Sequence, residues 1–329
     1  MARRSRSKQG KPSPDKGLVA ENYPDLNATF YGMKPHAYLR RRLRSLWLWH
    51  GDPPGLAEVL EQRFIVDNIA VTLGTEGDDE AEKEERERFV VIEAEVLLHH
   101  VSETLLRLYL VHAKESPCPW LDISREKSFF LLKKDISRLR ERLKIGAEKA
   151  GIEAAFLPPG DRRKMIPDHG EEVWEEAIQN LSEYLNYYAG HFLDSAPYNA
   201  AKHGLALLAG ESAVELIAGG DSDPFIKRSG PALVYLEVER EEKSGDPRWA
   251  KVTKWIVLRR ALAMIHIGCR LIEELWKIGT GHRTPNKPVD LNLFTEPKCA
   301  EVLKRTEYES QGGIPGVITD RLSERLLYR

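Results

Sequence analysis

The sequence has few cysteines, no long apolar run and almost no net charge. Its three cysteines, Cys118, Cys269 and Cys299, are widely spaced in 329 residues, so they form neither a disulfide framework nor a Cys-x-x-Cys metal site. We therefore expect a chain of the reducing cytoplasm with no structural metal and no cofactor. The net charge of −2 excludes an overall field that attracts nucleic acid, so any basic surface must be local.

Membrane and secretion patterns are missing as well. No stretch reaches the roughly eighteen consecutive apolar residues of a membrane span. The basic N-terminus is not followed by the apolar run of a secretory signal, and no internal repeat is found. We therefore expect no membrane partner.

What remains is the composition of a globular protein, with 42% hydrophobic and 30% charged residues. At this length the chain is one large or two ordinary domains. Residues 1–17 carry six basic side chains against Asp15, a net charge of +5, with Gly, Ser and Pro between them. This pattern is typical of a disordered basic arm, which we extend to residues 1–30. The arm is either a solubilising tail or a contact for phosphate.

Hydrophobic periodicity predicts a mainly helical fold. The expected helices cover 35–49, 56–73, 80–113, 124–150, 170–193, 195–210 and 256–278, with weaker helical patterns over 297–305 and 319–328. In the segment 124–150, Phe130 and Leu131 are among the residues expected to point inward. Its outer face carries a net charge of +4, which is a solvated face or a nucleic-acid contact.

One region changes period. Residues 232–239 alternate apolar and charged side chains, residues 249–257 do so more loosely, and the turn sequence EKSGDP lies between them. This pattern predicts a β-hairpin over 232–257, inserted in a helical domain of residues 81–280. An N-terminal helical extension would precede that domain at 31–80, and a C-terminal extension would follow it at 281–329.

The long segment 80–113 carries a polar stripe of Glu95, His99, His100 and Glu103. Glu95–His99 and His99–Glu103 are four residues apart and share a helix face. A metal or proton-transfer site is one hypothesis, but neither a Glu-x-x-His nor a His-Glu-x-x-His pattern is present. We therefore favour a stripe whose polar groups are satisfied by neighbouring elements.

The richest chemistry lies in the predicted helix 195–210, SAPYNAAKHGLALLAG. Asp194 or Ser195 would cap it, Pro197 suits its first turn and Gly210 would end it. A buried stripe is predicted at Tyr198, Ala201, Leu205 and Leu208. Asn199 and His203 are four residues apart, with Lys202 beside them, so an acid/base residue, an amide and a cation gather near the N-terminal end.

The chain resembles the HEPN superfamily, which is named for higher eukaryotes and prokaryotes nucleotide-binding. The resemblance lies in the motif Tyr198-Asn199-Ala200-Ala201-Lys202-His203-Gly204, which follows two long predicted helices. The resemblance covers residues 85–278 and implies a helical bundle with an inserted β-hairpin. It also implies a homodimer, in which a second subunit would cover part of the apolar segment 256–278, and a setting in bacterial defence or toxin–antitoxin systems.

Ribonucleases of this superfamily use an Arg, a polar residue and a His, without metal. By that resemblance Asn199 takes the polar position and His203 the acid/base position, and Lys202 would hold phosphate. Tyr198 stands where the Arg is expected, and a phenol brings no charge to a phosphoryl transition state.

Three functions follow from these residues. The missing Arg favours a non-catalytic HEPN-like module that binds a protein partner, a nucleotide or a nucleic acid. The alternative is a metal-independent ribonuclease whose site includes Tyr198, Asn199, Lys202 and His203. A helical metalloprotein that uses His99 and Glu103 is the third hypothesis.

Overall fold

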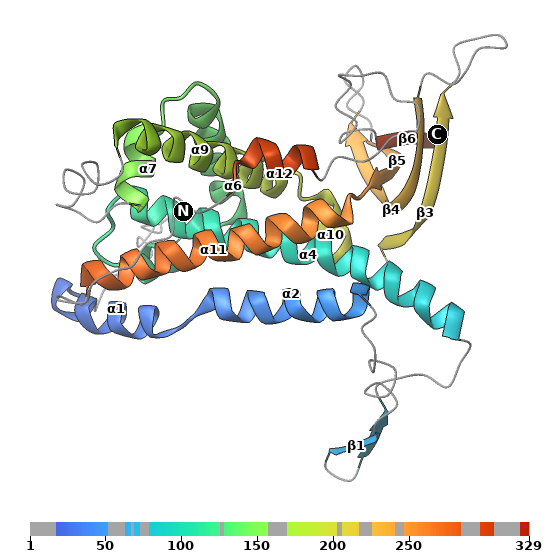
Figure 1. The fold of residues 1–329 in the computed structure, drawn as a ribbon, viewed down its shortest axis with the longest axis horizontal. Helices are drawn as coiled ribbons and strands as arrows, with labels where there is room; N and C mark the ends of the chain where they lie inside the picture. Colours follow the sequence, from blue (N-terminus) through green and yellow to red (C-terminus); the bar gives the residue numbers. More distant parts are fainter. Residues whose placement is uncertain are drawn as a thin grey trace, which may run out of the picture.

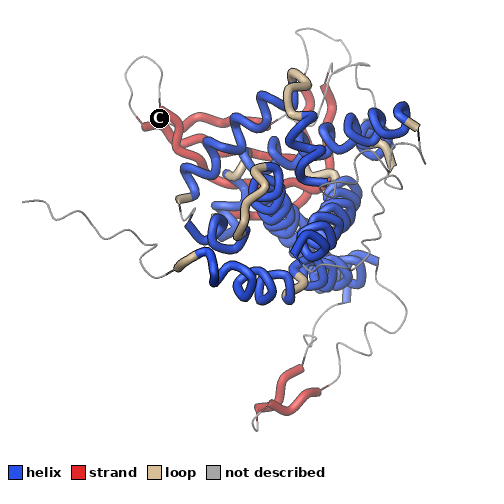
Figure 2. The backbone as a smooth tube through the Cα atoms, turned by 90° about the vertical axis from the view of Figure 1, so that its left-hand side faces the viewer, coloured by secondary structure: helices blue, strands red, loops and turns tan. Residues whose placement is uncertain are grey.

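The computed structural model describes residues 18–51, 63–66, 69–72, 79–125, 128–156, 170–202, 206–216, 226–240, 247–283, 297–305 and 323–328. These residues form a bundle of helices with an antiparallel sheet at one end (Figure 1). When the bundle is viewed along its length, the strands of the four-stranded sheet lie behind the helices (Figure 2). The prediction of a mainly helical fold with an inserted hairpin is confirmed.

Two long helices form the centre of the bundle. α4 (Asp79–Ala113) matches the predicted segment 80–113, and α11 (Leu258–Arg283) lies against it. Gly268 of α11 permits this close approach, because a Cβ there would overlap Cγ1 of Val101 and lie 3.1 Å from Oη of Tyr188. Both helices bury apolar side chains along their contact, as their sequence period requires.

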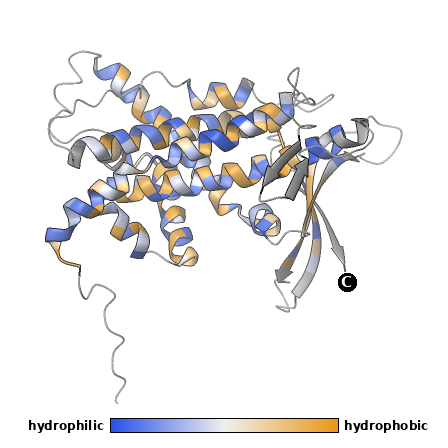
Figure 3. Cartoon of the chain, turned by 90° about the horizontal axis from the view of Figure 1, so that it is seen from below, coloured by the Kyte–Doolittle hydropathy of each residue, from blue (hydrophilic) through white to orange (hydrophobic). Residues whose placement is uncertain are grey.

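The remaining helices surround this pair and turn their apolar sides inward (Figure 3). They are the short 3-10 helix η1 (Ala20–Asn22), α1 (Tyr23–Gly32), α2 (Pro35–Gly51), α5 (Pro119–Arg125), α6 (Phe129–Lys144), α7 (Lys149–Phe156), α9 (Glu171–Leu193), α10 (Ala196–Lys202) and α12 (Cys299–Arg305). α2 packs on α4 and α11, while α6 packs on α9. In the part of the chain that the structure describes, no helix has the length and apolar character needed to cross a membrane.

The N-terminal helices belong to the same core as the rest of the bundle. Tyr31, Leu39, Leu43 and Leu46 are buried in one cluster with α4 and α11. The described residues 31–51 therefore share one core with α4 and α11. Since α1 begins at Tyr23, regular structure also starts within the predicted arm of residues 1–30; its first seventeen residues lie outside the described ranges.

The predicted helix 124–150 is wrong at both ends, because α5, α6 and α7 replace it. α6 ends where Gly146 adopts a positive φ of 69° and Ala147 N donates to Arg142 O at 2.9 Å. Glycine reaches this backbone conformation without the strain that a Cβ causes. The inward residues also differ: Phe130 and Leu131 are 74% and 51% exposed.

The larger sheet has the order β3-β4-β5-β6, with every pair antiparallel. Its strands are β3 (Leu207–Leu216), β4 (Ile226–Arg240), β5 (Pro247–Trp255) and β6 (Ser323–Tyr328). β4 and β5 confirm the hairpin predicted over 232–257. Leu233, Tyr235 and Val252 on one face of the sheet pack with Val91 of α4 and Ala200 of α10.

The predicted helix 195–210 is correct only in its first half. α10 ends at Lys202, and from Leu207 the chain pairs with β4, with Leu207 opposite Tyr235. The local helical pattern loses to strand pairing with a segment that lies more than twenty residues away. Leu208, assigned to a buried stripe, is 63% exposed on β3; Leu205 lies outside the described residues.

Two more helical predictions are wrong. The segment 56–73 contains β1 (Arg63–Val66) and β2 (Ile69–Thr72), which pair antiparallel with Val66 opposite Ile69. β-branched residues in both strands favour this hairpin. The segment 319–328 contains β6 instead of a helix.

Candidate functional site

α10 places three of the four sequence-predicted site residues against α4. The chain leaves α9 at Leu193 and enters α10 at Ala196, so the two helices form a tight corner. Asn199 N donates to Ser195 O at 2.9 Å in the first turn. This corner presents Tyr198, Asn199 and Lys202, whereas His203 lies outside the described residues.

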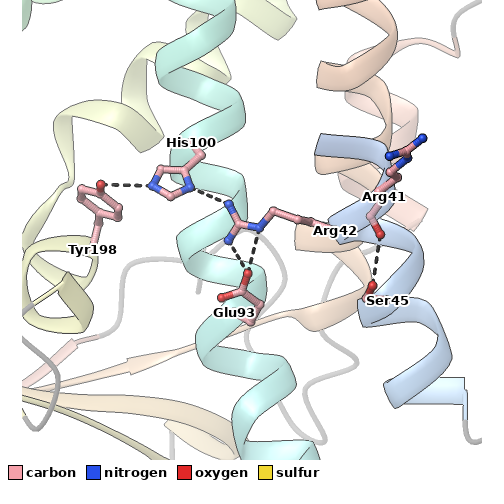
Figure 4. A network of polar contacts seen from close by, with 6 residues as sticks. All are labelled: Arg41, Arg42, Ser45, Glu93, His100 and Tyr198. Carbon is pink, nitrogen blue, oxygen red and sulfur yellow. Dashed lines mark hydrogen bonds and ion pairs between the residues drawn. The ribbon is translucent and has the colours of Figure 1, made fainter. Parts of the chain in front are cut away.

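The Tyr198 hydroxyl belongs to a chain of polar contacts that reaches α2 (Figure 4). Tyr198 Oη lies 3.1 Å from His100 Nε2, and His100 Nδ1 lies 2.8 Å from Arg42 Nη1. A guanidinium only donates, so Nδ1 accepts and Nε2 carries the proton that it donates to Tyr198. Burial and the charge of Arg42 lower the pKa of His100, which keeps the ring neutral.

Arg42 is itself neutralised. Its guanidinium forms an ion pair with Glu93, which precedes the polar stripe of α4. We call Arg42, Glu93, His100 and Tyr198 the tyrosine network. Its outer end is an arginine with a carboxylate partner, so the network contains little uncompensated positive charge.

The ring of Tyr198 is held as firmly as its hydroxyl. It stacks on the imidazole of His99, with centroids 3.9 Å apart and planes 9° apart. His99 is 1% exposed, also stacks on Phe192, and has no hydrogen-bond partner for either ring nitrogen among the described residues. Burial lowers the pKa of His99 to about 3, so it is a neutral aromatic surface at neutral pH.

Among the described residues, Asn199 and Lys202 make no hydrogen bond or ion pair with this network. The Asn199 amide donates to Ser195 Oγ at 3.3 Å, and Lys133 Nζ donates to the same oxygen at 2.6 Å. Lys202 is exposed and has no partner among the described residues. The predicted pairing of Asn199 with His203 stays a prediction.

The polar stripe on α4 is divided among separate partners. Glu95 is buried, and its Oε1 accepts from Lys254 Nζ of β5 at 2.9 Å; the same ammonium lies 3.1 Å from Asp194 Oδ2. Burial alone would raise the pKa of Glu95, but the charge of Lys254 holds it below its usual value. Glu103 pairs with Arg107. Within the described ranges, no three His, Cys, Asp or Glu side chains gather as metal ligands.

A groove between α2 and α4 begins at the tyrosine network. Its polar end has a volume of about 250 Å³ and is lined by Pro35, Tyr38, Leu39, Arg42, His100, Glu103 and Thr104. The adjoining end, which we call the aromatic chamber, has a volume of about 540 Å³. It is lined by Thr29, Phe30, Met33, Lys34, Pro35, Tyr38, Thr104, Arg107, Leu108, Trp120, Ile123 and Trp276.

Sequence analysis did not identify the part that α2 plays in this site. It gave residues 35–49 only as an expected helix, whereas Arg40 of this helix pairs with Glu273 and Arg42 with Glu93. The alternation of arginines with Leu39 and Leu43 was the available sign that this helix packs against acidic neighbours. The partners lie 233 and 51 residues away, so helix periodicity could not identify them.

Comparison of the chain with protein-family models, curated proteins and solved structures finds no match.

Proposed function

We propose that this chain is a non-catalytic, HEPN-like binding module whose ligand surface is the groove between α2 and α4. The observation that carries the proposal is the state of Tyr198. Its ring stacks on His99 and its hydroxyl accepts from His100, so the residue in the arginine position of the motif acts as a packing anchor. The groove begins at His100 and Arg42, which link this anchor to α2, and it offers a concave surface of the size that small ligands occupy.

The charges beside Tyr198 support the same proposal. A phosphoryl site needs cations that stay available for the developing negative charge of the transition state. Arg42 is the cation linked to Tyr198 through His100, and Glu93 already compensates it. Glu103 adds a carboxylate to the same end of the groove. A phosphate would therefore meet the Glu103 carboxylate there, beside an arginine that is already paired with Glu93.

The alternative is a metal-independent ribonuclease with a non-standard site. Lys202 favours it, because this lysine is exposed and precedes His203 directly in the sequence. In that case Lys202 would hold phosphate, His203 would move the proton and Asn199 would orient either group. A homodimer and a setting in bacterial defence remain parts of the HEPN-like hypothesis.

An RNA-cleavage gel separates the two functions. Wild type, His203→Ala and Lys202→Ala are incubated with single-stranded and hairpin RNA in the presence of a metal chelator. The binding-module proposal expects intact RNA in all three reactions. Cleavage by wild type that disappears in His203→Ala would overturn it in favour of the ribonuclease.

Tyr198→Phe tests the anchor itself. Removing the hydroxyl leaves the His100 Nε2 proton without its acceptor while the ring stays in place, so the free energy of unfolding should fall by about 1 kcal/mol. Urea denaturation measures this loss. Tyr23→Phe, on helix α1, is the matched control, because no described residue forms a hydrogen bond with the Tyr23 hydroxyl. Equal stability of Tyr198→Phe and wild type would contradict the anchoring role.

A further inference from the structure

The aromatic chamber is walled by rings that other contacts hold in place. Phe30 stacks on Trp120 with centroids 6.2 Å apart and planes 18° apart, and it lies 4.7 Å from the ring of Trp276. The Trp276 indole is fixed by a hydrogen bond from Nε1 to Tyr31 O at 3.1 Å. The chamber therefore exists before any ligand arrives, which reduces the entropy cost of binding.

The mouth of the chamber leaves large apolar side chains in contact with water. Met33, Tyr38 and Trp120 are 69%, 63% and 38% exposed, although each lines the chamber. A volume of about 540 Å³ falls in the range of roughly 300–1,000 Å³ that small-molecule sites occupy. Aromatic walls and an open mouth suit a planar apolar body that stacks on the rings and covers the exposed side chains.

The charged residues of the chamber have one sign. Lys34 and Arg107 line it, and no carboxylate does so among the described residues. Arg107 forms an ion pair with Glu103, which lines the polar end of the groove. The Lys34 ammonium has no ion-pair or hydrogen-bond partner within the described ranges. An anionic group on the ligand would give this cation a partner at the edge of an apolar surface, where a charge pair is screened less than in bulk water.

We propose that the aromatic chamber binds a small aromatic anion, a planar ring system carrying one carboxylate or sulfonate-type group. The rings lie against Phe30, Trp120 and Tyr38, and the anionic group lies at Lys34. This inference rests on the proposed function and adds the chemical class of the ligand. It places the ligand in the apolar end of the groove, away from the carboxylates of the polar end.

Two fluorescent probes with the same rings test both halves of the proposal. 8-Anilinonaphthalene-1-sulfonate carries the anionic group, and N-phenyl-1-naphthylamine has the rings without it. Each is titrated into wild type, Lys34→Glu and the matched control Lys134→Glu, which changes an exposed lysine on α6. Lys34→Glu should raise the Kd of the sulfonate about tenfold, the loss of one charge-assisted contact, and leave the neutral probe unchanged.

Trp120→Ala tests the aromatic wall. It should weaken both probes, because it removes a stacking surface that both use, and a melting curve checks that the variant is folded. Equal sulfonate affinity in wild type and Lys34→Glu would overturn the assignment of the anionic group. Unchanged binding of both probes in folded Trp120→Ala would show that they bind outside the chamber, and would overturn the site.

These outcomes are independent of the ribonuclease test. If the Kd of each probe is unchanged in Lys34→Glu and in Trp120→Ala while RNA stays intact, the proposed ligand class is wrong and the binding-module proposal stands. If wild type cleaves RNA through His203, the binding-module proposal fails whatever the probes do.

Discussion

His99 shows how burial changes the use of a polar side chain. Sequence analysis placed it in a stripe with Glu95 and Glu103, where a histidine is a natural ligand or acid/base. In the fold its ring stacks on Tyr198 and Phe192, and neither nitrogen has a partner among the described residues. The imidazole therefore acts as a flat apolar surface, and protonating it would lower the stability of the fold.

We predict that stability falls as pH drops below about 6.5. The pKa of His99 is lowered to about 3 by burial, with His191, His100 and Lys133 adding to the shift and Glu95 opposing it. Between these two pKa values the unfolded chain binds a proton that the native chain does not. The contribution of His99 to the free energy of unfolding is therefore largest above pH 6.5. It declines as the pH falls toward 3, by at most about 1.4 kcal/mol per pH unit.

Urea denaturation of wild type and His99→Phe at several pH values between 7.5 and 5 measures the effect. The phenyl ring keeps the stacking partner but removes the proton site, so the variant should show a flatter pH dependence. His50→Phe, at the exposed end of α2, should keep the wild-type slope. Parallel slopes for His99→Phe and wild type would show that His99 does not resist protonation.

At the scale of elements, Gly268 determines how closely α11 lies on α4. We predict that Gly268→Ala destabilises the fold by about 2–4 kcal/mol, because the new Cβ overlaps Val101 and approaches Tyr188 in a packed core. Thermal melting measures the loss. Gly32→Ala is the matched control, since nothing lies within 4 Å of its Cβ. Similar melting of both variants would mean that the two helices separate at little cost.

The elements also show which features sequence could predict. The segments 80–113 and 170–193 carry their apolar residues at helical spacing, so their helices follow from local information. β3 does not, because Leu207–Leu216 becomes a strand only through its pairing with β4, and the helical pattern of its first residues pointed elsewhere.

The candidate site follows the same division. Tyr198 and Asn199 were predicted from a motif, and the structure places both on a short helix beside α4. Arg42 and the aromatic chamber were not predicted, because they require the packing of α1, α2, α5 and α11 around α4. The hydrophobic periodicity of one segment does not show which distant segment it packs against.

At the scale of the whole molecule, Lys254 connects the sheet to the bundle. It extends from β5 to the buried Glu95 of α4 and to Asp194 after α9. Burial alone would lower the pKa of Lys254, but the two carboxylates raise it. The bundle and the sheet therefore share one compensated charge cluster.

We predict that Lys254→Met lowers the free energy of unfolding by about 2–4 kcal/mol, because it leaves Glu95 buried without its cation. The double variant Lys254→Met with Glu95→Leu should recover part of the loss. Lys251→Met, on the same strand, is the control. Chemical denaturation of wild type, Lys254→Met, Glu95→Leu and the double variant measures the coupling, and additive losses in the double variant would show that the two residues do not interact.

The same scale bears on the predicted homodimer. The apolar segment 256–278 suggested that a second subunit covers part of it. Between Leu258 and Gly281, however, only Arg259 and His266 are exposed, because helices of the same chain cover the rest. The homodimer stays a prediction of the family resemblance, and the hydrophobicity of α11 is explained without it.

The contacts between α2 and α11 have a consequence for synthesis on the ribosome. Arg40 and Glu273 are 233 residues apart, and Trp276 bonds a carbonyl 245 residues earlier. At about 5–20 residues per second, the first helices emerge roughly 10–50 s before their partner exists. During that interval Leu39, Leu43 and Leu46 have no α11 to pack against, so the nascent chain presents a site for chaperones until its last third is translated.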